Sequence, residues 1–340
     1  MDTNTSGAVF VQTNDAASNQ VVAFRRGEDG ALAQLGTYDT GGRGNGMPHL
    51  PSQGSIVAAG DHVLVTNPGS DDVSVFAIGP DGLVFTDRAH AGPAPRSVAV
   101  HDGLVYVLGT AGLTGLRLGA DGKLAPIDGS ARELSSAEAD GAQIAFSPDG
   151  GTVVVTERVT DRISTYAVGA DGLLDGPTPH ASSGATPYGF DFGAEGVLVV
   201  TEAFGGKVGA AAASSYRLNG APGLTPVSAS VQNTRSEVCW AAVSKDGRHA
   251  FVTNFGDNTV SSYRIAPDGS LELLDAVAAS TRLGEKGLRD EVLSADGRFL
   301  YALDADAQTI HGWSITAEGG LIPAGTADGL PATVAGLAAV

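Results

Sequence analysis

Four titratable side chains stand in turns that precede short apolar segments of this chain. They are His49, Arg96, Glu237 and Glu291. A histidine or a carboxylate at such a point can act as a general base toward water or an acidic C–H group. An arginine can pair with a substrate carboxylate or stabilise a developing oxyanion. We therefore take these four residues as candidate catalytic groups.

Six further side chains in comparable positions are candidates for substrate binding. They supply amides, aromatic rings and guanidinium groups, and they are Gln53, Gln143, Tyr188, Arg235, Trp240 and Arg289. Each candidate also has a structural interpretation: an ion pair for an arginine, an exposed loop for His49, and solvated loop charge for the other charged residues. We interpret Cys239 as a small buried hydrophobic residue rather than a nucleophile.

These positions belong to a repeat that runs through the whole chain. Each copy has an apolar strand that ends in a polar residue, a turn, a second apolar strand and an Asp-Gly pair. The polar ends recur every 43 to 53 residues, at Asn14, Asn67, Thr110, Glu157, Glu202, Asn254 and Asp304. Seven copies with a period near 48 residues predict an all-β fold, a seven-bladed β-propeller of four-stranded antiparallel blades.

One copy shows how a blade is built. Its strands, named a to d from the central channel outward, are expected at 239–243, 250–253, 260–265 and from 271 onward. The chain begins inside a copy, since 9–13 matches strand b, and it ends on 333–337, which matches strand a. The C-terminal strand should therefore join the N-terminal blade and close the ring. We expect residues 1–340 to form a single domain.

The motifs carry a family resemblance. Phe146–Leu173, Ser244–Leu274 and Ser294–Leu321 follow the form Ser-x-Asp-Gly, apolar strand, polar turn, apolar strand and Asp-Gly or Glu-Gly. This pattern resembles the seven-bladed lactonase-type propellers, which include propeller-type 6-phosphogluconolactonase and carboxymuconate lactonising enzyme. The resemblance implies a lactone hydrolase that needs no cofactor. The motifs build blades, so they specify the fold more closely than the reaction.

In this topology the d–a and b–c loops emerge at the same end of the channel. We call it the d–a end, and the opposite end, where strand a turns into strand b, the a–b end. All ten candidate residues should line the mouth at the d–a end. Glu157, Glu202, Asn254 and Asp304 form a second ring there. They offer oxygen ligands that could hold Ca²⁺, although the turns of the repeat also account for them, and we predict no metal site.

Charge and composition limit the possible partners. The net charge of −18 disfavours nucleic acid and anionic membranes, and an anionic substrate would need local arginine or lysine. One cysteine allows no internal disulfide, and neither a signal peptide nor a membrane span is evident. We expect a monomeric, cytoplasmic protein whose partner is a small-molecule substrate.

Three functions remain open at this point. The first is a metal-independent lactonase-like enzyme that acts by general acid–base chemistry on a small, carboxylated or cyclic substrate. The second is a cyclase, cycloisomerase or lyase of a specialised biosynthetic pathway that uses the same site. The third is a non-catalytic propeller that binds a ligand or a protein.

Overall fold

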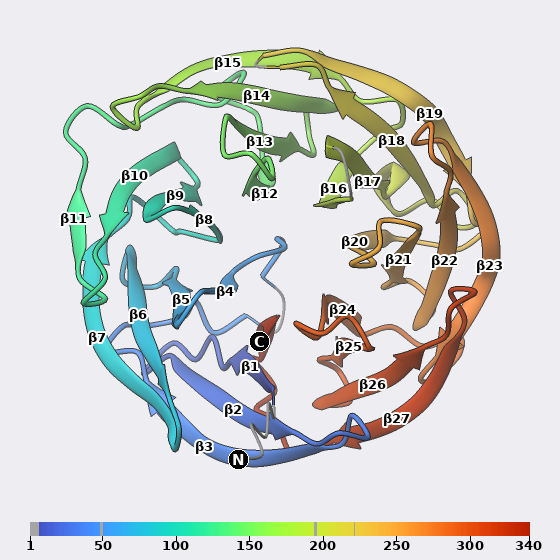
Figure 1. The fold of residues 1–340 in the computed structure, drawn as a ribbon, viewed down its shortest axis with the longest axis horizontal. Coiled ribbons are helices and arrows are strands. Elements are labelled where there is room, and N and C mark those ends of the chain that lie inside the picture. Colours follow the sequence, from blue (N-terminus) through green and yellow to red (C-terminus); the bar gives the residue numbers. More distant parts are fainter. Residues whose placement is uncertain (1–6, 48–49, 194–195, 221) are drawn as a thin grey trace.

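Seven four-stranded antiparallel sheets surround a common central axis (Figure 1). The computed structural model describes residues 7–47, 50–193, 196–220 and 222–340. These residues contain no α-helix, and a short 3₁₀ turn, η2 (Phe204–Gly206), follows one strand of the fifth sheet. The fold is the seven-bladed β-propeller that the repeat predicts.

Each sheet is one blade, and its four strands follow one another from the axis outward. Blade 1 consists of β28 (Ala335–Ala339), β1 (Ala8–Gln12), β2 (Gln20–Arg26) and β3 (Leu32–Asp39), and blade 2 of β4 (Ile56–Ala59), β5 (His62–Asn67), β6 (Asp72–Gly79) and β7 (Gly82–His90). Blade 3 consists of β8 (Ser97–His101), β9 (Leu104–Gly109), β10 (Gly112–Leu118) and β11 (Leu124–Pro126), and blade 4 of β12 (Gly141–Phe146), β13 (Thr152–Glu157), β14 (Arg162–Val168) and β15 (Leu174–Ala181).

The remaining three blades follow the same order. Blade 5 consists of β16 (Pro187–Phe192), β17 (Val197–Glu202), β18 (Ala212–Leu218) and β19 (Leu224–Gln232). Blade 6 consists of β20 (Val238–Val243), β21 (His249–Asn254), β22 (Thr259–Ile265) and β23 (Leu271–Ser280), and blade 7 of β24 (Leu288–Leu293), β25 (Phe299–Asp304), β26 (Thr309–Ile315) and β27 (Leu321–Ala327).

Burial within a blade follows its position between neighbouring blades. Every residue of β21 and of β25 is buried, because blades pack on both faces of these second strands. In the outermost β27 every residue except Ala327 is exposed or half-buried. This gradient explains why the second strands read as continuous apolar runs in the sequence.

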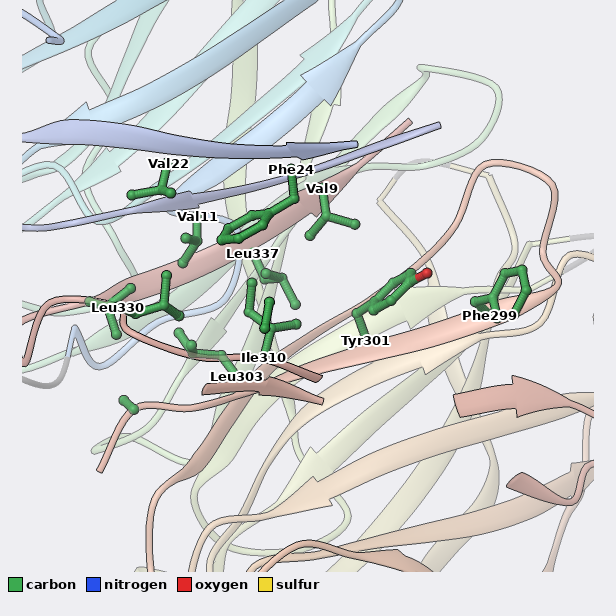
Figure 2. Close-up of a cluster of buried hydrophobic side chains, with 13 residues drawn as sticks. Val9, Val11, Val22, Phe24, Phe299, Tyr301, Leu303, Ile310, Leu330 and Leu337 are labelled. Carbon is green, nitrogen blue, oxygen red and sulfur yellow. The ribbon is translucent and has the colours of Figure 1, made fainter. Parts of the chain in front are cut away.

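The ring closes where the two ends of the chain meet. β28 pairs antiparallel with β1, with Val11 opposite Leu337. Leu337 packs with Leu303 and Ile310 of blade 7 in one buried cluster (Figure 2). The expected strand at 333–337 starts two residues later, because the Thr333 hydroxyl donates to the Thr13 carbonyl at 2.7 Å and so belongs to the preceding turn.

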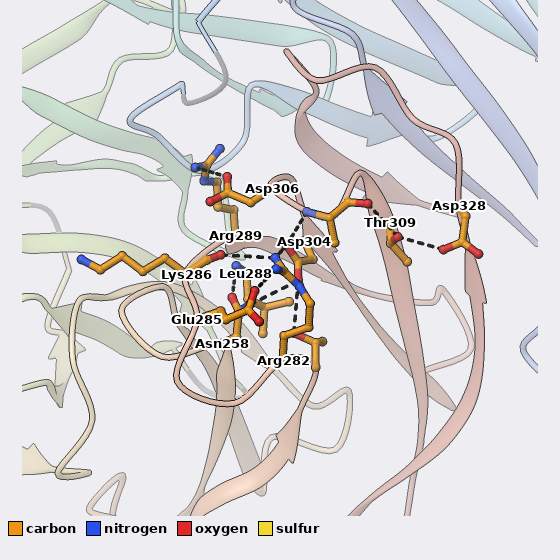
Figure 3. A network of polar contacts seen from close by, with 12 residues as sticks. Asn258, Arg282, Glu285, Lys286, Leu288, Arg289, Asp304, Asp306, Thr309 and Asp328 are labelled. Carbon is orange, nitrogen blue, oxygen red and sulfur yellow. Dashed lines mark hydrogen bonds and ion pairs between the residues drawn. The ribbon is translucent and has the colours of Figure 1, made fainter.

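Polar residues at the ends of five second strands connect neighbouring blades. These anchor residues are buried, and each bonds to the connection that arrives from the blade before it. Atoms of those connections lie 2.8 to 3.0 Å from the anchors, in the pairs Asn67–Thr40, Glu157–Ser135, Glu202–Gly184, Asn254–Asn233 and Asp304–Arg282. The Arg282 guanidinium contacts both oxygens of Asp304 (Figure 3).

Two of the seven expected strand ends were placed slightly too late. β1 ends at Gln12, because Asn14 has a positive φ of 50° and its backbone N–H bonds to the Asn19 side chain at 2.8 Å. β9 ends at Gly109, and the Thr110 N–H bonds to the Pro93 carbonyl at 2.9 Å. Both residues therefore belong to turns at the d–a end.

The closure should be sensitive to a single buried side chain. Leu337→Ala should lower the free energy of unfolding by about 2–4 kcal/mol, because it leaves a cavity between blades 1 and 7. Ile322→Ala is the matched control, since Ile322 is 55% exposed and should change stability by less than about 0.5 kcal/mol. Denaturant unfolding measures both, and equal effects would contradict the assigned closure.

Candidate functional site

The first residues of the innermost strands do not follow simple alternation. In blades 4 to 7 the register between the first and second strands shifts by a β-bulge. The shifts lie between Gly141 and Gln143, Pro187 and Phe190, Val238 and Trp240, and Arg289 and Glu291. A bulge redirects the side chains around it, so neighbouring candidates such as Arg289 and Glu291 can enter different surroundings.

An aromatic cluster occupies the d–a end of the channel. Tyr188 and Trp240 meet edge to face with ring centroids 5.5 Å apart, and Phe255 packs against them. The Trp240 indole N–H donates to the Ser52 carbonyl at 3.0 Å. Cys239 lies within the same cluster, where burial raises the pKa of its thiol far above the usual value. The thiol is therefore neutral near pH 7, as expected for a packing residue.

Two arginines flank this cluster from different blades. The guanidinium carbon of Arg158 lies 5.2 Å from the centroid of the Tyr188 ring, and that of Arg289 lies 5.1 Å from the centroid of Phe255. Lys286 places its ammonium 5.5 Å from the same Phe255 ring. Cation–π contacts of this kind hold positive charge against the ring faces. Each of these three cationic groups is also paired with a carboxylate group.

Each arginine has only part of its hydrogen-bonding capacity satisfied. Asp140 pairs with Arg158, and Asp306 lies 3.1 Å from Nη2 of Arg289 (Figure 3). Within the residues that the structure describes, Nε of Arg158 and both Nε and Nη1 of Arg289 are buried without a hydrogen-bond partner. The Tyr188 hydroxyl is likewise buried without a hydrogen-bond partner among the described residues. Buried donors without partners favour an anionic or oxyanionic ligand.

Glu237 stands beside this cluster in a strained backbone conformation. Its φ is +53°, a region that residues with a Cβ rarely adopt, and Gly287 occupies the corresponding place before β24. The Lys286 ammonium donates to both Glu237 oxygens, at 2.8 and 3.0 Å. About a quarter of the Glu237 side chain is exposed. A partly exposed carboxylate held by an ammonium remains available to water.

Arg96 and Arg235 lie in the same region but play different parts. Nη1 of Arg96 lies 2.5 Å from Oδ1 of Asp140, the carboxylate that also holds Arg158. Arg96 therefore positions Arg158 through a shared partner. Arg235 lies in the connection between β19 and β20. Its Nη1 is 3.7 Å from the carboxylate of Asp257 in the b–c loop of blade 6, and its Nη2 donates to the hydroxyl of Thr234.

The two candidate glutamines hold the edges of innermost strands. The Gln53 amide donates to the Ala241 carbonyl at 2.8 Å and accepts from the Ala241 N–H at 3.1 Å, which links blade 2 to blade 6. The Gln143 amide makes the same pair of bonds to Phe190, at 2.9 and 2.7 Å. An innermost strand has no further strand on its inner side, so these amides satisfy backbone groups that would otherwise be buried without partners.

A cavity of about 570 Å³ lies on the other side of these glutamines, toward the a–b end. Its lining includes Gln53 and Gln143 together with residues at the ends of the innermost strands, such as Val243 and Leu293. The repeat predicted function at the d–a end alone and gave no indication of this cavity. The repeat does not show how much of the space around the axis the side chains fill, so it cannot predict a cavity there.

Three carboxyl groups line the cavity, and burial raises the pKa of each. The pKa of Asp191 rises to about 6 and that of Asp290 to about 7. The pKa of Glu291 rises well above its usual value, first through burial and then through the like charges of Asp191 and Asp290. Glu291 forms part of the lining, but both of its carboxylate oxygens are buried, so they do not reach the mouth where they were expected. Asp191 interrupts the apolar alternation of β16, a signal that could have identified it.

The predictions for His49, for a Ca²⁺ site and for a membrane span remain to be compared with the structure. His49 is not among the described residues. The oxygens of Glu157, Glu202 and Asp304 that were considered for Ca²⁺ accept hydrogen bonds within and between blades. Across the described ranges, no group of three or more His, Cys, Asp or Glu side chains is placed to hold a metal ion. No helix in the described part of the chain is long and apolar enough to cross a membrane.

Comparison with known proteins identifies the family. A family model described as "Lactonase, 7-bladed beta-propeller" matches residues 119–208 and 199–331, which is more than half of the chain. The chain belongs to this lactonase family of seven-bladed propellers. No curated protein matches it.

Solved structures share the fold at low sequence identity. The periplasmic gluconolactonase PpgL of Pseudomonas aeruginosa is 18% identical with a TM-score of 0.76, and the alignment covers 97% of this chain and 98% of PpgL. A protein of Lactobacillus plantarum is 16% identical with a TM-score of 0.77, covering 98% and 99%. A protein of Bacteroides uniformis, provisionally assigned as a 6-phosphogluconolactonase, is 19% identical with a TM-score of 0.71, covering 97% and 98%. At this identity the likeness shows the fold alone.

The buried carboxyl groups predict an unusual dependence of stability on pH. Folding raises the pKa of Asp290 from about 4 to about 7, so the folded protein keeps a proton that the unfolded chain releases in this range. This group therefore makes the free energy of unfolding fall as pH rises from about 4 to about 7. Asp290→Asn removes this contribution. Between pH 5 and pH 8 the free energy of unfolding should therefore fall by about 2 kcal/mol less in the variant than in the unmodified protein. Urea unfolding at both pH values measures this, and identical pH dependence of the two proteins would contradict the assignment.

Proposed function

We propose that this chain opens the ring of a small lactone by metal-independent general acid–base chemistry at the d–a end of its channel. Membership of the lactonase family supports hydrolysis as the general class of reaction. The observation that carries the proposal is the pair of buried guanidinium groups, Arg158 and Arg289, whose unpaired N–H donors flank one aromatic cluster. Donors fixed in advance at a water-poor site stabilise the negative charge that forms on a carbonyl oxygen.

The proposed reaction needs one base and one anion holder. The Glu237 carboxylate takes a proton from water, and the water oxygen attacks the lactone carbonyl. Arg289 holds the resulting oxyanion until the ring C–O bond breaks. The proton on Glu237 then passes to the departing alkoxide, which gives a hydroxy acid and restores the carboxylate. Lys286 holds Glu237 in place through two hydrogen bonds, and Arg96 positions Arg158 through Asp140.

The substrate should be small, cyclic and carboxylated. Phe255, the partly buried ring of the cluster, suits a small cyclic substrate, and the second guanidinium, Arg158, suits a carboxylate on it. Local arginines are also what an anionic substrate needs against the net charge of −18. Trp240, which Ser52 holds, contributes as a wall of the cluster rather than as a direct partner. His49 stays a candidate base beside Glu237.

A cyclase, cycloisomerase or lyase is the second candidate function. Lactone formation is the reverse of ring opening and requires the same base and the same oxyanion holder. Two guanidinium groups that contact different rings of one cluster favour it, because an open-chain dicarboxylate could bind through both ends at once. The cytoplasmic location and the monomeric state also remain proposals; PpgL is named as a periplasmic protein.

Turnover of a lactone panel tests the proposal. Sugar lactones, carboxylated muconolactones and simple γ- and δ-lactones are followed by acid release, with and without EDTA. We expect turnover of a carboxylated lactone that EDTA does not reduce. Loss of turnover in the presence of EDTA would contradict the metal-independent mechanism. If no lactone of the panel were turned over, a cyclase or a non-catalytic binding protein would be favoured over a hydrolase.

The same assay tests the role of Arg289. Arg289→Met keeps much of the side-chain volume and removes the oxyanion holder, so turnover should fall about 10- to 100-fold. Arg96→Ala should lower it at least about tenfold by releasing Arg158. Arg264→Met is the control, because Arg264 is exposed and pairs only with Glu272. If Arg289→Met and Arg264→Met had the same small effect, Arg289 would have no part in the mechanism.

A further inference from the structure

A second pocket, of about 540 Å³, opens at the a–b end of the propeller where blades 5, 6 and 7 meet. We call it the blade 6 pocket, because most of its lining comes from that blade, from 246–249 and 264–267. Blade 5 contributes Val197 and Arg217, and the c–d turn of blade 7 contributes Ala317 and Glu318. None of these residues belongs to the proposed lactone site or to the cavity on the channel axis.

A contact that recurs between other blades explains what is different here. In blades 3 and 5 the first residue of strand b lies opposite an arginine of strand c, in the pairs Leu104–Arg117 and Val197–Arg217. Each arginine donates to the c–d turn of the next blade. Arg117 reaches the Asp171 carbonyl at 2.7 Å, and Arg217 reaches the Pro267 carbonyl at 3.1 Å. These bonds link neighbouring blades at the a–b end.

Blade 6 has the same arginine but lacks this link. His249 lies opposite Arg264, which pairs with Glu272 of its own blade at 2.8 Å. In the described part of the chain Arg264 makes no hydrogen bond to the c–d turn of blade 7. The space that the arginine bridges in the other blades therefore remains part of a pocket.

His249 is also a departure from the repeat. Apolar residues start strand b in blades 3, 5 and 7, and each lies beside the glycine of the next c–d turn, in the pairs Leu104–Gly172, Val197–Gly269 and Phe299–Gly30. His249 lies beside Gly319 in the same way. Packing alone accounts for an apolar side chain at this point, and it does not account for an imidazole.

The imidazole of His249 has no hydrogen-bond partner within the residues that the structure describes. The residue is 6% exposed and lines the pocket, and its backbone N–H alone is bonded, to the Ser244 hydroxyl at 2.9 Å. Unlike the oxygens of Glu291, its ring nitrogens are not fully enclosed, so a ligand in the pocket can reach them. Burial lowers the pKa of His249, so the ring is neutral at pH 8 and can accept a hydrogen bond.

Arg217 supplies positive charge that no ion pair compensates among the described residues. Its acceptors are two neutral carbonyls, those of Pro267 at 3.1 Å and Asp268 at 3.3 Å. The other arginines of the lining are each paired with a carboxylate, Arg248 with Asp246 and Arg264 with Glu272. An anionic group is therefore favoured at the blade 5 side of the pocket, beside Arg217.

The remaining lining suits the body of a small aromatic ligand. Five apolar side chains form part of the wall: Val197, Ile265, Ala266, Pro267 and Ala317. The volume of the pocket is in the range of small organic ligands. A flat ring packs well on such a wall and against guanidinium planes, which the arginines at the rim provide.

We propose that the blade 6 pocket binds a small aromatic carboxylate that carries a hydroxyl group. The carboxylate pairs with Arg217, the ring packs on Ile265 and Pro267, and the hydroxyl donates to His249. Glu318 stands on the blade 7 side, where it disfavours a second anionic group. The site lies at the opposite end of the propeller from the proposed lactone site and does not depend on the reaction proposed there.

Three compounds of similar size test this proposal in the intact protein. 3-(4-Hydroxyphenyl)propionate carries both groups, tyramine has an ammonium in place of the carboxylate, and 3-phenylpropionate lacks the hydroxyl. Isothermal titration calorimetry at pH 8 should show saturable binding of the first, binding of 3-phenylpropionate weaker by about fivefold, and no saturable binding of tyramine. No saturable binding of the first compound, or equal binding of either of the others, would overturn the proposal.

A matched pair of variants places the carboxylate. Arg217→Met and Arg117→Met remove equivalent links between blades, and only Arg217 lines the pocket. Arg217→Met should weaken binding of 3-(4-hydroxyphenyl)propionate at least about tenfold, while Arg117→Met should leave it unchanged. Equal affinity in the two variants would overturn the assignment to Arg217. Thermal melting confirms that both fold, and the comparison of compounds on the unmodified protein stands without them.

A change at His249 tests the hydroxyl contact separately. His249→Phe places there the residue that the repeat has at Phe299, so the variant should fold. It should bind 3-(4-hydroxyphenyl)propionate and 3-phenylpropionate equally, and a retained fivefold difference would overturn the role of His249. Arg289→Met alters the d–a end and should leave this binding unchanged. A tenfold loss in that variant would place the ligand at the d–a end and overturn the proposal.

Discussion

The innermost strand of each blade has a neighbouring strand on one side only, and this exposed edge faces the channel. Its N–H and C=O groups must find partners near the axis, where little water can reach them. Side chains from other blades provide these bonds: Gln143 to Phe190, Gln53 to Ala241, Asp191 to Val243 and Asp290 to Gly336. The channel is polar for this reason before any function is considered.

This constraint places amide and carboxyl groups along the axis and leaves two different environments at its ends. At the d–a end, bulges and the b–c turns bring aromatic rings together with arginines that are only partly paired. At the a–b end, the strands finish around a cavity whose described charged groups are three carboxyl groups and one lysine. The proposed lactone chemistry belongs to the d–a end.

The repeat predicts the fold well because its signal is local. Buried second strands, Asp-Gly turns and polar strand ends recur in every well-formed copy, and the strands at 250–253 and 260–265 were placed within one residue at each end. The ring closure was also predicted, although β28 begins two residues later than expected. Where a single hydrogen bond moves a boundary, as at Asn14 and Thr333, the repeat has no information.

The site was less predictable, because it depends on contacts between blades that are distant in sequence. The sequence identified Arg96, Tyr188, Trp240, Glu237 and Arg289 as neighbours of the d–a end, where the structure places them. Gln53 and Gln143 were assigned to substrate, but they bond to the backbone of other blades, and the repeat cannot show which edges need them. Glu291 was assigned to the mouth, but it follows the bulge after Arg289 and both of its carboxylate oxygens are buried.

The most direct measurement of the central claim is a crystal structure with gluconate, the open-chain product of a sugar lactone. The claim is that the d–a end holds the anionic part of the ligand between Arg158 and Arg289. We expect carboxylate density within hydrogen-bonding distance of the unpaired nitrogens of Arg289, beside the Phe255 ring. Gluconate bound in the cavity beside Glu291, or bound elsewhere with both guanidinium groups unchanged, would contradict it.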